Sequence, residues 1–144
     1  MPWHATVIGP RSPVARAEGT ALFAAYVSQG PCYTLTIDGK PVAAGGVVVV
    51  TPSTFETWMI CCKDIERYQV SLYWAANKLI NQMFDTYGVR RLQAVVDKNK
   101  VPYRKWAERL GFHVEGPSLL HFGPNGETYM RYVRFKDGGS DVHR

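Results

Sequence analysis

The hydrophobic pattern of the chain changes its period from that of a strand to that of a helix near residue 66, and this change limits the folds that the sequence can adopt. Residues 55–62, FETWMICC, alternate between two faces, as expected of a β-strand. From residue 66 to residue 87 the period becomes helical, and the predicted apolar face comprises Leu72, Ala76, Leu79, Ile80, Met83 and Tyr87, with Gly88 ending the helix. Residues 89–97, VRRLQAVVD, read as another strand. Strand, helix and strand in succession predict a parallel pair joined by a right-handed crossover.

The first part of the chain has the pattern of an antiparallel meander. Strands are predicted over 3–8, 32–37 and 41–50, and a helix over 12–30. Asp38-Gly39 separates two of these strands and is a strong two-residue hairpin signal. The strand over 55–62 follows as the third strand of this meander, after 32–37 and 41–50, so an antiparallel meander leads into the parallel pair.

The last part of the chain predicts one more helix and a terminal hairpin. The stretch 99–112, NKVPYRKWAERLGF, is expected to form a helix that Asn99 caps and Gly111 ends. Strands are predicted over 112–123 and 127–135, around Pro124-Asn125-Gly126. The order β-α-β-β-β-α-β-α-β-β indicates an α+β fold, an α/β sandwich with helices on the faces of a mixed sheet. We expect a single domain over 1–136 and a disordered tail over 137–144.

Composition and charge narrow the classes of function. The 144 residues are 46% hydrophobic, and no apolar run reaches the ~20 residues that span a bilayer, so no membrane association is expected. The N-terminus lacks the pattern of a signal peptide, which favours a cytoplasmic protein. Three cysteines, Cys32, Cys61 and Cys62, argue against a disulfide framework, and the histidines lack metal-ligand spacing, so no metal site is expected. The net charge of +5 favours an anionic ligand.

The order of elements, Asn99 and a helix ending Leu110-Gly111-Phe112 together resemble the GNAT N-acyltransferase superfamily, over about residues 3–135. The form Trp-x-x-x-Leu-Gly-Phe, with ETWMI on the fourth strand, is most similar to small GNAT-like proteins encoded by bacteriophages. The resemblance implies that the fourth and fifth strands are parallel and splay apart.

The resemblance also implies acetyl-CoA as cofactor, with its pantetheine arm between the splayed strands and its pyrophosphate at the start of the following helix. The residues that it assigns to the cofactor are Ile60, Cys61, Cys62, Arg67, Tyr68, Gln69, Val70, Ser71, Leu72, Asn99, Tyr103 and Trp106. Arg67 fits the first position of the family's Arg/Gln-x-x-Gly-x-Gly/Ala loop, whereas Val70 and Leu72 stand where glycine and a small residue belong. The same segment also fits an ordinary core helix capped by Asp64, and both interpretations stay open.

For the chemistry, the resemblance implies Glu56 on the fourth strand as the general base, acting directly or through water. An exposed carboxylate at a sheet edge explains Glu56 as well. Main-chain N–H groups near Ile60 and Cys61 are candidate donors to the oxyanion if the strand bulges there.

The family's general acid is a tyrosine four residues before the glycine of Gly-Phe, and Ala107 occupies that position here. Tyr103, one turn earlier on the same helix face, is the candidate acid in its place. Alternatively, Tyr103 and Trp106 form an aromatic packing pair.

Three functions compete at this point. The first is acetyl-CoA-dependent transfer of an acetyl group to an amine of a protein or a small molecule. The second is a catalytically weakened scaffold, a phage-type effector that binds and modulates a host protein in the host cytoplasm, with an oligomer compatible with either function. The third is nucleic-acid binding by basic residues beside aromatic ones, namely Arg90, Arg91, Lys98, Lys100, Arg104, Lys105 and Arg109. Asp97 and Glu108 balance that charge, which argues against nucleic acid.

Overall fold

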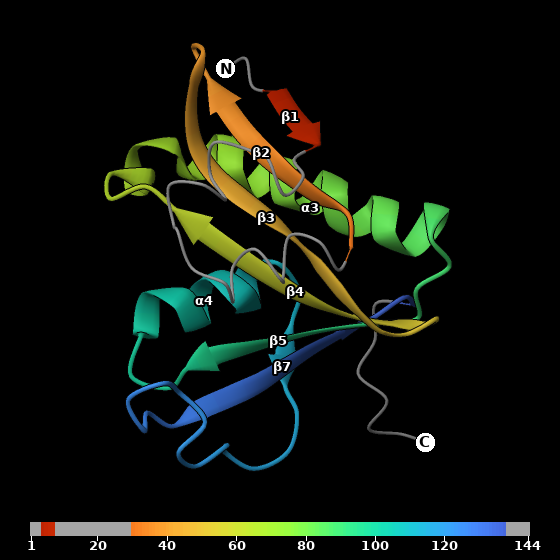
Figure 1. Ribbon diagram of the computed structural model, residues 1–144, viewed down its shortest axis with the longest axis vertical. Coiled ribbons are helices and arrows are strands. Elements are labelled where there is room, and N and C mark those ends of the chain that lie inside the picture. The colour runs from red at the N-terminus through yellow and green to blue at the C-terminus, as the bar shows by residue number, and fades with distance from the viewer. Residues whose placement is uncertain (1–3, 8–29, 138–144) are drawn as a thin grey trace.

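The computed structural model of the protein describes residues 4–7 and 30–137. These residues form a seven-stranded mixed sheet in the order β1-β2-β3-β4-β5-β7-β6 (Figure 1). The elements are β1 (His4–Val7), β2 (Cys32–Ile37), β3 (Lys40–Thr51), β4 (Thr54–Cys61), η1 (Ile65–Tyr68), α3 (Gln69–Thr86), β5 (Arg91–Asp97), α4 (Val101–Arg109), β6 (His113–Val114) and β7 (Tyr129–Phe135). The predicted order is confirmed for these elements. The helix predicted over 12–30 and the tail predicted over 137–144 fall, apart from Gly30 and Asp137, outside the described residues.

The meander forms as its turn chemistry predicts. Strand β2 pairs antiparallel with β3, and Ile37 lies opposite Lys40 across a two-residue turn. Asp38 and Gly39 have φ angles of +53° and +78°. Positive φ at both central residues belongs to the tight hairpin turn that matches strand twist, and aspartate and glycine tolerate it best.

Strands β4 and β5 are parallel and lie side by side only at their beginnings. Their register contains Thr54 opposite Arg91, Phe55 opposite Leu92, and Glu56 opposite Gln93. Strand β4 continues to Cys61 and β5 to Asp97, and Figure 1 shows their arrowheads pointing apart, with α4 seen between them. The splay that the resemblance implied is therefore present in the strand register.

Helix α3 connects these two strands and packs on the sheet. A 3-10 turn, η1, leads into it, so the predicted helix begins in a tighter form. Its buried side chains are Ser71, Leu72, Ala75, Ile80, Met83 and Phe84. Tyr87, predicted on the apolar face, is 42% exposed because the helix has ended at Thr86, and Gly88 follows with φ +68°, the left-handed conformation expected after a helix C-terminus.

Helix α4 begins at Val101, and its N-cap residue is Lys100 instead of the predicted Asn99. The main-chain N–H of Asn99 donates to Asp97 Oδ1 at 2.9 Å, and no side chain caps the first turn. The cap prediction is wrong because the aspartate turns the chain two residues earlier, before helical geometry starts.

The other end of α4 is fixed to the sheet. Arg134 of β7 donates from Nη1 to the main-chain oxygen of Leu110 at 2.9 Å, which pairs a cation with the negative end of the helix. Gly111 then takes φ +89°, as predicted for a helix-ending glycine.

The terminal hairpin is shorter on one side than predicted. Strand β6 contains only His113 and Val114, because Gly116 turns with φ +77° and Pro117 has no main-chain N–H to donate. Leu119 pairs with Tyr129 as an isolated bridge. Strand β7 pairs on one side with β6 and on the other with β5, so it lies inside the sheet.

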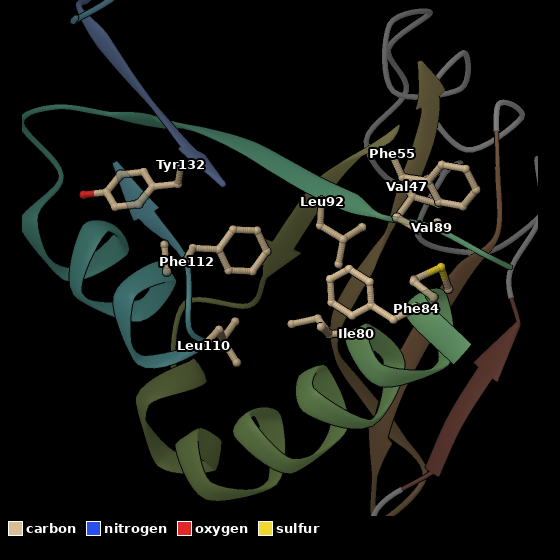
Figure 2. Packing of buried hydrophobic residues seen from close by; sticks show 11 residues of the cluster. Val47, Phe55, Ile80, Phe84, Val89, Leu92, Leu110, Phe112 and Tyr132 are labelled. Carbon is tan, nitrogen blue, oxygen red and sulfur yellow. The ribbon is translucent and has the colours of Figure 1, made fainter. Parts of the chain in front are cut away.

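The larger core lies between the sheet and both helices. In Figure 2, Leu92 of β5 and Phe84 of α3 point toward one another, and Leu110 and Phe112 bring the end of α4 into the same cluster. Leu92 and Tyr132 have no exposed surface. Each fully buried aliphatic or aromatic side chain contributes about 1.5–3 kcal/mol. Because both helices share this face of the sheet, the residues that alternate with Leu92 along β5 point to the opposite face, called here the outer face.

Candidate functional site

The ladder between β4 and β5 ends where a side chain replaces a main-chain donor. Thr57 Oγ1 donates to the main-chain oxygen of Gln93 at 3.3 Å, one residue beyond the last paired residue, Glu56. Farther along, Trp58–Cys61 of β4 and Ala94–Asp97 of β5 do not pair with each other. The ladder between β4 and β5 is therefore limited to the first three residues of each strand.

Glu56 begins a chain of hydrogen bonds across the outer face. Gln93 Nε2 donates to Glu56 Oε1 at 3.0 Å, and Gln93 Oε1 accepts from Arg91 Nε at 3.0 Å. Arg91 donates through both terminal nitrogens to Glu115, one bond measuring 2.8 Å. The hydrogen bonds from Arg91 hold the pKa of the Glu115 carboxyl below its usual range. The side chain of Glu56 is therefore fixed by a hydrogen bond from Gln93, next to the point where the β4–β5 ladder ends.

Asp64 occupies the predicted N-cap position before the segment expected to bind pyrophosphate, but its side chain makes no capping hydrogen bond. The carboxylate of Asp64 instead accepts a hydrogen bond from Cys62 Sγ at 3.1 Å, which lowers the pKa of Asp64. Arg67 lies 3.7 Å from Asp64 and is largely exposed. Its guanidinium stacks 5.9 Å from the centre of the Tyr68 ring. The cation at the first loop position thus lies at the surface, in an exposed ion pair with Asp64.

The two bulky loop residues lie in different environments. Leu72 is 7% exposed and packs in a second core cluster with Leu35, Ala43 and Ala75. Val70 is 71% exposed. Because the bulk of Leu72 fills the core, only Val70 adds bulk on the surface of this helix start.

The candidate residues of α4 divide between core and surface. Ala107 is 7% exposed and belongs to the larger core. Tyr103, one turn earlier, is 62% exposed. Trp106 does not form the expected ring pair with Tyr103; it packs edge-to-face against Tyr73 of α3, with ring centres 6.4 Å apart. Tyr103 thus keeps its hydroxyl at the surface, and Trp106 joins the two helices.

The end of β4 does not bulge as the oxyanion hypothesis requires. The β3–β4 register is continuous from Phe55 to Cys61, and its irregularity lies at the opposite end, between Val49 and Thr51. Loss of hydration around the Cys61 thiol, followed by the charge of Cys62, raises the pKa of Cys61 to about 11, although the residue is exposed. At neutral pH this thiol is protonated and is a poor nucleophile.

Asn99 and two of the basic residues have surroundings that the sequence did not indicate. Asn99 is exposed just beyond the end of β5. Arg91 pairs with Glu115, and Arg104 donates from Nε to the hydroxyl of Tyr132 at 3.2 Å. Two of the seven basic residues of the nucleic-acid hypothesis thus bind groups of the protein itself, which weakens that hypothesis further.

The structure brings Thr57, Gln93 and Glu115 to the site, and no motif in the sequence indicates these three residues. The available signal was the alternation on β5, where polar Gln93 stands between apolar Leu92 and Ala94 and Arg91 precedes Leu92. Their partners lie 37 and 24 residues away, so only the fold reveals the contacts. None of the described helices is both long enough and apolar enough to cross a membrane.

Comparison with known proteins gives matches of structure. No protein-family model and no curated protein matches the sequence. The structure is similar to the F149G mutant of spermidine N-acetyltransferase SpeG from Vibrio cholerae, with a TM-score of 0.73, 9% identity, and 94% of each chain covered. It is also similar to IAA acetyltransferase from Bacillus cereus, with a TM-score of 0.71, 13% identity, and coverage of 92% of this chain and 98% of that one.

A GNAT-family acetyltransferase from Bacillus anthracis is a further match, with a TM-score of 0.66, 14% identity, and coverage of 81% of this chain and 72% of that one. At such identities the similarity concerns the fold. The chain has the fold of the GNAT acetyltransferases.

Proposed function

We propose that the chain is an acetyl-CoA-dependent N-acetyltransferase that transfers an acetyl group directly to an amine of a small molecule or a protein. The observation that carries the proposal is the early end of the β4–β5 ladder with Glu56 beside it, in a fold shared with N-acetyltransferases. The Vibrio cholerae neighbour is a spermidine N-acetyltransferase, which makes an aliphatic amine a suitable first acceptor to test.

The residues around the splay fit acetyl-CoA in most respects. The edges of β4 and β5 offer main-chain donors and acceptors to an extended pantetheine arm. Lys63 and Arg67 are exposed cations near the start of the helix, where a pyrophosphate is favoured. Exposed Glu66 and Val70 oppose it through charge and bulk. When bound, acetyl-CoA supplies an acetyl group activated as a thioester.

Glu56 and Tyr103 take the two proton-transfer roles. An alkyl ammonium has a pKa of ~10.4 in water, so the acceptor needs a base before it can attack. Glu56 Oε1 is held by Gln93, and Oε2 is the atom that takes the proton, directly or through water. The exposed hydroxyl of Tyr103 gives a proton to the leaving thiolate. Cys61 needs no role as an acyl carrier, in keeping with its raised pKa.

A binding experiment and a turnover experiment test the proposal separately. A ligand at 100 times its Kd stabilises the folded protein by about 2.7 kcal/mol, so acetyl-CoA is expected to raise the melting temperature. Glu56→Gln is expected to keep this shift and to lose acetylation of spermidine and related amines, followed by mass spectrometry. Asp85→Asn, an exposed carboxylate near the far end of α3, is the matched control. No melting shift at millimolar acetyl-CoA would reject the proposal.

A second candidate function, that of a catalytically weakened GNAT scaffold that binds a host protein, is favoured by Ala107. The position where the family has its general-acid tyrosine is occupied by a buried alanine, so this chain keeps the fold but lacks that catalytic residue. A phage-type effector that acts in the host cytoplasm would need only the fold. Acetyl-CoA binding without transfer to any amine of a broad panel, together with specific retention of one bacterial protein, would favour this candidate.

A further inference from the structure

Four side chains form a continuous hydrogen-bonded chain on the outer face: Glu56 of β4, Gln93 and Arg91 of β5, and Glu115, which follows β6. We propose that Gln93 is a positioning residue that orients the carboxylate of Glu56 for proton transfer, and that Arg91, fixed by Glu115, sets the orientation of Gln93. This inference rests on the proposed function of Glu56 as the base. It adds three residues to the site that the family resemblance did not indicate.

The orientation of the Gln93 amide follows from the chemistry of its neighbours. A guanidinium has only donors, so the group that faces Arg91 Nε at 3.0 Å must be the amide oxygen of Gln93. The amide nitrogen then has to face Glu56, where it lies 3.0 Å from Oε1. A rotated amide would place a donor against the donor of Arg91 and an oxygen against the carboxylate. The arginine therefore ensures that Glu56 receives an N–H donor.

Arg91 is itself held on three sides. Its two terminal nitrogens bind the two oxygens of Glu115, a planar two-bond contact that fixes the guanidinium. Its guanidinium also lies 6.0 Å from the centre of the Phe135 ring on β7. Glu115 follows β6, and its main-chain N–H donates to the main-chain oxygen of Arg131 at 2.9 Å. Because β7 lies between β5 and β6, the pair crosses over one strand and is anchored on both sides.

Gln93 is also fixed through its main chain. Its main-chain oxygen accepts from Thr57 Oγ1, so residue 93 contacts β4 through both backbone and side chain where the ladder ends. With Oε1 occupied, none of the described residues bonds to Oε2 of Glu56. The base thus presents one defined oxygen in a fixed orientation, and this reduces the entropy lost when an acceptor binds in a reactive geometry.

The hydrogen bond is tested by NMR without reference to activity. The side-chain amide signals of Gln93 are assigned by their disappearance in Gln93→Leu. In Glu56→Gln and in Arg91→Met the Gln93 protons are expected to move upfield and to exchange faster with water, because a charged acceptor or the orienting donor is gone. Asp85→Asn should leave them unchanged. Gln93 signals identical in wild type, Glu56→Gln and Arg91→Met would overturn the proposal.

The positioning role is tested by steady-state kinetics and a double variant. Gln93→Leu is expected to lower kcat about 10- to 100-fold, the range for a hydrogen bond to a charged group, with KM for the amine little changed. In a Glu56→Gln background the same substitution should cost nothing more, because Gln93 acts through Glu56. Gln82→Leu on α3 is the matched control and should keep wild-type turnover.

The possible failures are distinguishable. A full additional loss from Gln93→Leu in the Glu56→Gln background, or an unchanged kcat in Gln93→Leu alone, would overturn the positioning role. Absence of acetyl transfer by the wild-type protein would instead reject the proposed function, and the NMR result would still decide whether Gln93 holds Glu56.

Discussion

Thr57 donates a side-chain hydrogen bond to the main-chain oxygen of Gln93, at the point where β4 and β5 stop pairing. In a regular parallel ladder a main-chain N–H would meet that oxygen. Since the threonine hydroxyl meets it here, the two strands can separate without leaving a partly buried acceptor unpaired. The splay is thus built into the sequence of β4 at one residue.

Thr57→Val keeps the shape of the side chain and removes its donor. We expect the free energy of unfolding to fall by about 1 kcal/mol, measured by urea denaturation, because the oxygen of Gln93 loses a partner. Thr54→Val, at the beginning of the same strand, is the control and should change stability by less than about 0.5 kcal/mol. Equal losses in the two variants would show that the hydroxyl of Thr57 contributes nothing specific.

Val70→Gly should strengthen binding of CoA. Removing the exposed side chain lets a phosphate oxygen approach the helix start, and one added hydrogen bond of about 0.5–1.5 kcal/mol corresponds to a roughly 2- to 12-fold lower Kd by calorimetry. Leu72→Gly is the comparison variant. Because the Leu72 side chain fills the core, this variant should lose about 2–5 kcal/mol of stability without binding CoA more tightly. A Kd unchanged in Val70→Gly would remove Val70 as the obstacle.

Tyr103→Phe should slow acetyl transfer and leave the structure intact. General acid catalysis commonly contributes about 100-fold or more, so kcat is expected to fall by that order while the Kd for acetyl-CoA stays constant. Stability should change by less than about 0.5 kcal/mol, because the side chain is 62% exposed. Tyr87→Phe, another exposed tyrosine outside the site, serves as control. Wild-type turnover in Tyr103→Phe would show that the proton comes from elsewhere.

Cys61 should react slowly with alkylating reagents. Its pKa of about 11 leaves roughly one thiol in a thousand ionised at pH 8, so iodoacetamide should modify it about 200-fold more slowly than a free thiol of pKa ~8.5. The rate, measured by mass spectrometry in a Cys62→Ser background, should rise up to about pH 11. Between pH ~8.5 and 11 the unfolded chain loses this proton first, so the thiol lowers stability as pH rises. Fast modification at pH 8 would contradict the raised pKa.

The pair between Arg91 and Glu115 should stabilise the protein at neutral pH and lose this effect in acid. The pKa of Glu115 is lowered in the folded state, so its stabilisation is present above the unfolded value of about 4.3 and is lost as pH falls through the folded value. Because both side chains are partly exposed, Glu115→Gln should cost about 0.2–1 kcal/mol at pH 7. That difference should shrink below pH ~4. Glu66→Gln, the control, should show no such dependence.

Local patterns predicted most of the described elements. The Asp38-Gly39 turn and the helical period after β4 depend on neighbouring residues, and both formed where the sequence placed them. The boundaries were less well predicted where two local signals competed. Asn99 is a residue type that commonly caps helices, but its main-chain N–H donates to the carboxylate of Asp97 and the helix begins later. Similarly, β6 contains only two residues because Gly116 turns the chain.

The contacts that define the candidate site could not be predicted from local pattern. Glu56 and Gln93 lie 37 residues apart, and they meet because the parallel register places them opposite each other. Arg91 reaches Glu115 over a strand that comes later in the sequence than both. The environments of Val70 and Leu72 also differ for a tertiary reason, since only one of them faces the core.

Strand β7 follows every other strand in the described chain, and it lies between β5 and β6. During synthesis on the ribosome, β5 therefore emerges long before the partner on its far side exists. Tyr132 and Val133, which have no exposed surface, reach the core only when residues 129–135 have left the exit tunnel. The half of the sheet that holds Arg91, Gln93 and Glu115 is thus expected to assemble late, and nascent chains would hold β5 with one edge open until then.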